Sequence, residues 1–220
     1  AWAWRGLLKR RVLQYESAVK DLSRAWSLGM RSSMLLTWLG EARLQTGDAG
    51  GMEDLERALK LPAQAWNHAW CGRSKVAFGR SRTALSHFDR AIELDAGNGW
   101  YYAWRAEAKR LLGVTERMIE DFDRALSLDL HGHEGFVSTW RGLACVRLGR
   151  HREALTDFAR ALRLMPGYAL ACHGRAQAYR ALGRLPEWFA NFESAARLDY
   201  KYVQAQFLRP KEELEALVSD

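Results

Sequence analysis

The chain has 220 residues, of which 48% are hydrophobic, and it carries a formal net charge of +7. It contains no uncharged apolar run of about 18 residues, so the sequence predicts no transmembrane helix. Three scattered cysteines exclude a disulfide framework and favour a reducing compartment, which indicates a cytoplasmic protein. The opening residues 1–5 do not resemble a signal peptide, and because they begin inside a predicted helix without Met, we expect a piece of a longer protein.

Two series of residues recur along the chain in one register. Tryptophans, each followed two residues later by Gly or Ala, are spaced by 34, 32, 34 and 36 residues: Trp4, Trp38, Trp70, Trp104 and Trp140. Half a repeat away lies a series of alanines, each with Leu or Phe three residues before it: Ala25, Ala58, Ala91, Ala125, Ala161 and Ala195. Because two independent series keep the same spacing, the chain is predicted to be a tandem repeat.

Each repeat is predicted to be a helix, a glycine turn and a second helix. Glycine ends a helix readily because it adopts the left-handed conformation at little cost. The turn glycines are Gly47, Gly79, Gly113, Gly149 and Gly183. Six repeats follow in chain order, covering about 1–32, 33–64, 65–98, 99–134, 135–168 and 169–200.

Three repeats depart from this pattern in their loops. The first lacks the turn glycine, the second is one residue short around 48–51, and the fourth ends in a two-residue insertion at 131–134. After the sixth repeat, residues 201–208 begin like another first helix, but Pro210 stops it, so 201–220 is predicted to be a capping helix and tail. This tail could lead into a further domain.

Three segments carry a resemblance to a known family. They are WRGLACVRLGR (140–150), ALTDFARALRLMP (154–166) and ALSHFDRAIELDA (84–96). Their aromatic, Leu-Gly and Ala positions resemble the tetratricopeptide repeat (TPR), whose period is about 34 residues. The resemblance covers residues 1 to about 200 and implies an all-α fold, a right-handed superhelical solenoid of antiparallel helix pairs. It also implies scaffolding rather than chemistry, although such arrays are often attached to catalytic domains, including glycosyltransferases.

The tryptophans are predicted to face away from the core of each helix pair. If the Gly or Ala after the tryptophan is position 8, the core-facing positions are 4, 7, 8 and 11, and the tryptophan at position 6 lies on another side. Position 2, one turn earlier, is also large and apolar. In the resembled family this face lines a concave groove. We name this set the tryptophan stripe: Trp4, Trp38, Trp70, Trp104 and Trp140, with their companions Met34, Trp66, Trp100 and Phe136.

The tryptophan stripe is the predicted binding site for a protein partner. Large exposed apolar patches are often functional, and indoles dominate interface hot spots. We therefore predict that the stripe binds an extended peptide or a partner helix, with register set by the position-9 charges Glu41, Arg73 and Glu107. The alternative, that neighbouring first helices bury the indoles against each other, stays open.

A second pattern links position 7 to the residue sixteen places later. Arginines at position 7 are followed at that distance by an acid or amide: Arg5 with Asp21, Arg105 with Asp121, Arg141 with Asp157 and Arg175 with Asn191. The third repeat has Cys71 and His87 there instead. Because both residues change together, we predict that they touch across the helix pair and form structural ion pairs.

Other function classes have less support in the sequence. Cys71 and His87 lack an orienting third group, so no catalytic residue is predicted. The segment His131–Glu134 has no further ligand in register, so neither a metal site nor a cofactor is predicted. The net positive charge and the indoles leave nucleic acid and glycan as rival ligands, but the cations are spread around the array, which disfavours nucleic acid. The family's lysine and asparagine clamp for chaperone tails is absent.

Overall fold

The structure is a computed structural model that describes residues 1–62, 64–77 and 81–198, and these residues form twelve α-helices and no strand. Their bounds are α1 (Trp2–Arg11), α2 (Tyr15–Ser27), α3 (Ser33–Gln45), α4 (Gly50–Leu59), α5 (Ala65–Ala77), α6 (Ser81–Leu94), α7 (Gly99–Leu112), α8 (Met118–Ser127), α9 (Glu134–Arg147), α10 (His151–Leu164), α11 (Ala169–Ala181) and α12 (Leu185–Leu198). The predicted cap and tail at 201–220 and the predicted turn at Gly79 lie outside the described residues.

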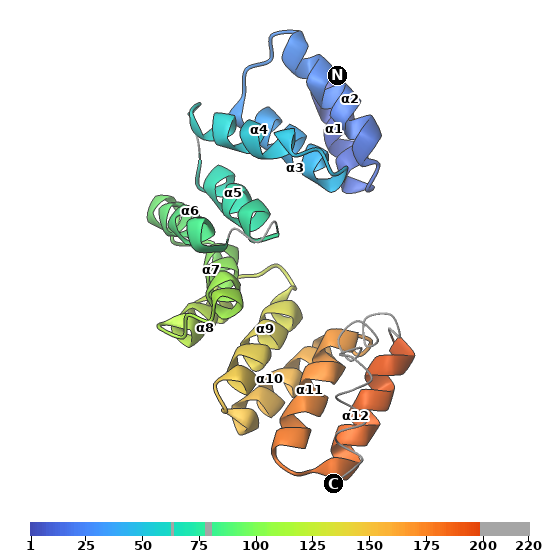
Figure 1. The fold of residues 1–220 in the computed structure, drawn as a ribbon. Helices are drawn as coiled ribbons and strands as arrows, with labels where there is room; N and C mark the ends of the chain where they lie inside the picture. Colours follow the sequence, from blue (N-terminus) through green and yellow to red (C-terminus); the bar gives the residue numbers. More distant parts are fainter. Residues whose placement is uncertain (63, 78–80, 199–220) are drawn as a thin grey trace. The chain divides into compact units, whose positions relative to one another are not determined.

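Consecutive helices form antiparallel pairs, α1 with α2 through α11 with α12 (Figure 1). In five of these pairs the connection lies in the described residues, and it is short. The two helices of a pair share the most extensive contacts of the fold. The prediction of an all-α array of six helix pairs is therefore confirmed. In the part of the chain that the structure describes, no helix has the length and apolarity to cross a membrane.

The chain divides into two compact units, Ala1–Leu128 and the segment from Asp129 onward. In the first unit each first helix contacts the next one, α1 with α3, α3 with α5 and α5 with α7, and in the second unit α9 contacts α11. Among the described residues, no comparable contact joins successive second helices within a unit. The first helices therefore line the inner side of each unit. The right-handed superhelical course of the whole array stays a prediction.

Buried phenylalanines explain the small residue at position 8. Phe88 and Phe158 are fully buried, and each ring lies against the glycine of its own repeat. A Cβ added at Gly72 would lie 2.8 Å from Phe88 Cε1, and one added at Gly142 would lie 2.8 Å from Phe158 Cε1. Because protein interiors are packed to near-crystalline density, a larger residue here would separate the two helices of the pair.

The turns between paired helices have the predicted backbone conformation. Gly47, Gly113, Gly149 and Gly183 all have a left-handed backbone, with φ between 72° and 81°. The first repeat, which lacks the glycine, has Leu13 at the same place with a φ of 62°. The turn geometry is therefore kept even where a side chain makes it unfavourable.

Candidate partner-binding surface

The tryptophan stripe lies on the first helices, which form the inner side of each unit. Trp4 is 67% exposed and Met34 is 39% exposed. The other members are half-buried: Trp38 on α3, Trp66 and Trp70 on α5, Trp100 and Trp104 on α7, and Phe136 and Trp140 on α9. Part of each ring is therefore open to solvent, and part is covered.

The covered part of an indole packs against a buried cluster built from its own repeat and the preceding one. Trp38 contacts a buried cluster that contains Leu22 of α2. Trp104 contacts clusters that contain Phe88 and Ala91 of α6. No helix precedes α1 in the described residues, and Trp4 is correspondingly the most exposed member of the stripe. Packing thus accounts for one side of these rings.

The indoles of neighbouring first helices also contact one another. The ring centroids of Trp4 and Trp38 are 6.3 Å apart, and those of Trp70 and Trp104 are 6.0 Å apart, with an interplanar angle of 51° in both pairs. Trp100 lies 5.6 Å from Trp104 on the same helix. These centroid distances lie in the range of about 4.5 to 7 Å that is usual for interacting aromatic pairs. In the first unit the stripe is therefore a set of mutually supported rings.

A cation lies over the middle of the stripe. The Arg73 guanidinium is 4.5 Å from the Trp70 ring centroid and 5.8 Å from that of Trp104. Both distances are within the range of cation–π attraction. Among the described residues Arg73 makes no ion pair. The stripe therefore presents an exposed positive charge between two indoles.

Glu41 joins Trp70 and Arg73 in a small cleft between α3 and α5. The cleft has a volume of about 50 Å³ and is lined by Glu41, Leu44, Gln45, Trp70, Arg73, Ser74 and Ala77. Burial raises the pKa of the Glu41 carboxyl, and the charges of Arg10 and Arg73 act against this rise. Arg10 forms an ion pair with Glu41. The structure thus brings together two of the three predicted register charges.

The third predicted charge, Glu107, lies apart from that cleft. It forms an ion pair of 2.6 Å with Arg110, three residues later on the same helix. Sequence reasoning did not identify Arg10 and Arg110 as the partners of the groove carboxylates. The spacing of Glu107 and Arg110 on a helix was a usable signal, whereas Arg10 and Glu41 are 31 residues apart and meet only in the folded chain.

The predicted contacts across each helix pair are confirmed. The ion pairs are Arg5–Asp21 at 2.7 Å, Arg105–Asp121 at 2.5 Å and Arg141–Asp157 at 2.7 Å, and Arg175 donates a hydrogen bond of 2.5 Å to Asn191. The Arg5 guanidinium holds the pKa of the Asp21 carboxyl well below its ordinary value. Cations four places after position 7 also pair with an aspartate of the second helix: Lys9 with Asp21, Arg43 with Asp54 and Lys109 with Asp121. Their shared spacing was a signal that sequence reasoning missed.

The third repeat replaces the ion pair by a thiol and an imidazole. Cys71 Sγ lies 3.7 Å from His87 Nε2. Burial raises the pKa of the Cys71 thiol to about 11 and lowers that of His87 to about 4, so both groups are neutral near pH 7. A protonated, buried thiol is a poor nucleophile. Within the described ranges, no group of three or more His, Cys, Asp or Glu side chains could hold a metal ion.

The comparisons with known proteins bear on the fold. No protein-family model matches the chain, and no curated protein is detectably similar to it in sequence. Several solved structures share its architecture. A tetratricopeptide repeat protein from Parabacteroides merdae has a TM-score of 0.71 at 16% identity, and the match covers 99% of this chain and 96% of that one. The chain has the tetratricopeptide-repeat fold.

Two further solved structures support this assignment of the fold. The APC/C hetero-tetramer Cut9–Hcn1 matches with a TM-score of 0.81 at 13% identity, over 91% of this chain and 40% of that one. YrrB, described as a TPR protein with an unusual peptide-binding site, matches with a TM-score of 0.62 at 16% identity, over 84% of this chain and 95% of that one. The tryptophan stripe therefore lies on the first helices of a TPR array.

Proposed function

We propose that this TPR array is a non-enzymatic protein-interaction module, and that it binds an extended peptide or a partner helix along the tryptophan stripe. The observation that carries the proposal is the half-open cluster of Trp70, Trp100 and Trp104, with Arg73 over two of the rings. Indole side chains lose little conformational entropy when they bind a partner, and these rings already contact one another in the free chain.

The packing of each indole supports this function rather than competing with it. One side of Trp104 packs against buried clusters with members on α5, α6 and α7, which holds the ring in place, while the rest of it stays accessible. A binding site needs side chains held in place by the scaffold. The peptide-binding site named for YrrB, a protein of the same fold, is consistent with this use of the array.

The charges favour a peptide over nucleic acid. Two carboxylates, Glu41 and Glu107, lie on the same first helices as the indoles. Binding of nucleic-acid phosphates requires clustered cations, and carboxylates among those cations would weaken it. Arg73 would pair with a carboxylate or backbone carbonyl of the bound segment. The apolar contacts of the indoles would supply most of the affinity.

The proposal is tested with peptides selected from a displayed random library on the whole chain. Affinity of a selected peptide is measured by fluorescence anisotropy for the wild type and for Trp70→Ala/Trp104→Ala. Hot-spot indoles contribute about 2 kcal/mol or more each, but such losses do not add, so the double variant should bind at least about 30-fold more weakly, the loss expected for one indole. The control is Trp26→Ala, which removes a half-buried indole from the second helix α2 and should leave the affinity unchanged.

Two results would contradict the proposal. One is undiminished peptide binding by the folded double variant. The other is a ligand preference for nucleic acid, with affinity that falls steeply with salt concentration, or for soluble oligosaccharide, with quenching of tryptophan fluorescence. Peptide binding by the stripe should instead change little with salt, because burial of the indoles dominates it.

A further inference from the structure

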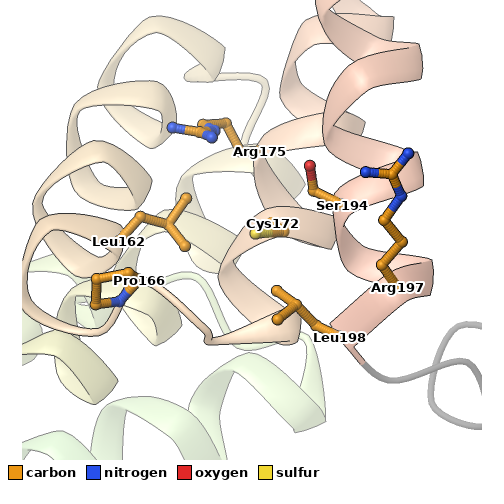
Figure 2. Close-up of a pocket in the computed structure, with 7 residues that line it drawn as sticks. All are labelled: Leu162, Pro166, Cys172, Arg175, Ser194, Arg197 and Leu198. Atoms are coloured by element: carbon orange, nitrogen blue, oxygen red, sulfur yellow. The ribbon is translucent and has the colours of Figure 1, made fainter.

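A cavity of about 360 Å³ lies in the second unit, away from the tryptophan stripe. Leu162 and Pro166 form one side, Ser194 and Leu198 of α12 form the other, and Cys172 and Arg175 of α11 lie between them (Figure 2). Its volume falls in the range of about 300 to 1,000 Å³ that is usual for small-molecule sites.

The cavity lies where the sixth repeat has small residues at two places that the fourth repeat fills with large ones. In the fourth repeat these two places hold Tyr102, three residues before the position-7 arginine, and Arg124 of the second helix. The Arg124 guanidinium lies 6.0 Å from the Tyr102 ring centroid. The equivalent residues of the sixth repeat are Cys172 and Ser194. Replacing an aromatic ring and an arginine by a thiol and a hydroxyl leaves space between α10, α11 and α12.

The same repeat leaves an arginine charge without a carboxylate. In the fourth repeat Arg105 contacts two acids, Asp121 sixteen residues later at 2.5 Å and Asp89 sixteen residues earlier at 2.8 Å. The equivalents around Arg175 are Asn191 and Ala159. Arg175 receives only the amide oxygen of Asn191, and within the described residues it makes no ion pair.

The remaining charges near the cavity do not replace these acids. Arg197, at the cavity edge, is already paired with Glu193 at 2.6 Å. Burial raises the pKa of the Cys172 thiol, and the positive charge of Arg175 acts against this rise. The Arg175 charge is therefore felt inside the cavity.

We propose that the cavity of the sixth repeat binds a small carboxylic acid that carries a short aliphatic chain. Its carboxylate pairs with Arg175 and supplies the negative charge that Asp21, Asp121 and Asp157 supply in the first, fourth and fifth repeats. Its chain covers Leu162, Pro166 and Leu198. The site is independent of the tryptophan stripe and of the peptide-binding function proposed above.

The probe is octanoate, titrated into the whole isotope-labelled chain and followed by amide chemical shifts and calorimetry. We expect saturable shifts centred on the amides of Cys172, Arg175 and Ser194. Octylammonium has the same chain with the opposite charge, and inorganic phosphate has charge without a chain. Both should fail to produce these shifts, because the site needs an anion and an apolar body together.

Variants separate the site from general effects of charge. Asn191→Asp restores the missing ion pair and should weaken octanoate binding about tenfold or more, because the new carboxylate competes for Arg175. Its fold should persist, since three other repeats carry this pair. Asn98→Asp adds the same charge at the N-cap of α7 and is the matched control, with unchanged affinity.

Cys172→Tyr, which copies the fourth repeat, should abolish binding by filling the cavity.

The proposal is overturned by any of three results. These are no saturable octanoate shifts in the second unit, equal losses of affinity in Asn191→Asp and Asn98→Asp, or equal binding of octylammonium or phosphate at the same amides.

Discussion

The fourth and sixth repeats are built on one plan but differ at position 6 and in the partners of the position-7 arginine. In the fourth, Trp104 stands at position 6 and Arg105 is held between two aspartates. In the sixth, position 6 is Gly174 and Arg175 has an amide partner only. Both keep the helix pair, the turn glycine and the buried alanine of the second helix. The turn glycine and the buried alanine, which we call the framework residues, are thus shared by both repeats, and the remaining positions differ between them.

Steric crowding explains why the tryptophan stripe does not continue into the sixth repeat. A Cβ at Gly174 would lie 2.6 Å from Phe158 Cε1 and 3.1 Å from Leu143 Cδ2. Gly174→Ala should therefore destabilise the chain by about 3 kcal/mol in urea unfolding, although alanine usually stabilises a helix relative to glycine. Gly167→Ala, where the added Cβ would meet only Leu198 at 3.8 Å, is the control and should be near neutral. If Gly174→Ala proves as stable as the wild type, packing is not what ends the stripe.

Removing one charge from the fourth repeat makes it resemble the sixth. Asp121→Asn leaves Arg105 with Asp89 but takes a buried carboxylate away from both Arg105 and Lys109. We expect a loss of about 2 kcal/mol in the free energy of unfolding, because breaking a buried ion pair leaves the partner charges poorly compensated. The exposed Glu16→Gln is the control for loss of charge alone. Equal effects of the two substitutions would mean that the pair is only a surface interaction.

The third repeat extends the comparison to a pair that titrates. Burial lowers the pKa of His87 to about 4 from an ordinary 6.5, so between these values the unfolded chain binds more protons than the folded one. Stability should therefore fall as the pH falls from about 6.5 to about 4, with His87 contributing about 1 to 2 kcal/mol of the loss. In His87→Gln this part should be missing from the curve of unfolding free energy against pH. Parallel curves for the two proteins would show that His87 protonates freely in the folded state.

The sequence was sufficient for the fold because its signals are periodic. The tryptophan and alanine series mark the same register, and paired replacement at positions such as Cys71 and His87 indicated the contacts across a helix pair. The state of the stripe could not be predicted in this way. How much of Trp38 or Trp104 is covered depends on packing against buried clusters that span two repeats. The ion pair of Arg10 with Glu41 depends on two first helices lying side by side.

The first repeat offers the smallest effect and the cleanest test of a framework position. Leu13 occupies the turn where the other described repeats have glycine, with a φ of 62° and a side chain that is 70% exposed. A left-handed backbone at a residue with a side chain costs about 1 to 2 kcal/mol, and glycine removes this cost. Glycine also increases the conformational entropy of the unfolded chain, which offsets part of the gain. Leu13→Gly should therefore raise the free energy of unfolding by about 0.5 kcal/mol in thermal or urea unfolding.

Leu13→Ala separates backbone strain from contacts of the leucine side chain. Alanine keeps the Cβ and therefore the strain, so it should bring no gain, while glycine should keep the turn hydrogen bond from Gln14 N to Lys9 O and gain stability. If both variants lose stability equally, the leucine side chain makes a contact that stabilises the fold by more than the backbone strain costs. The first repeat would then have leucine at this turn because of that contact.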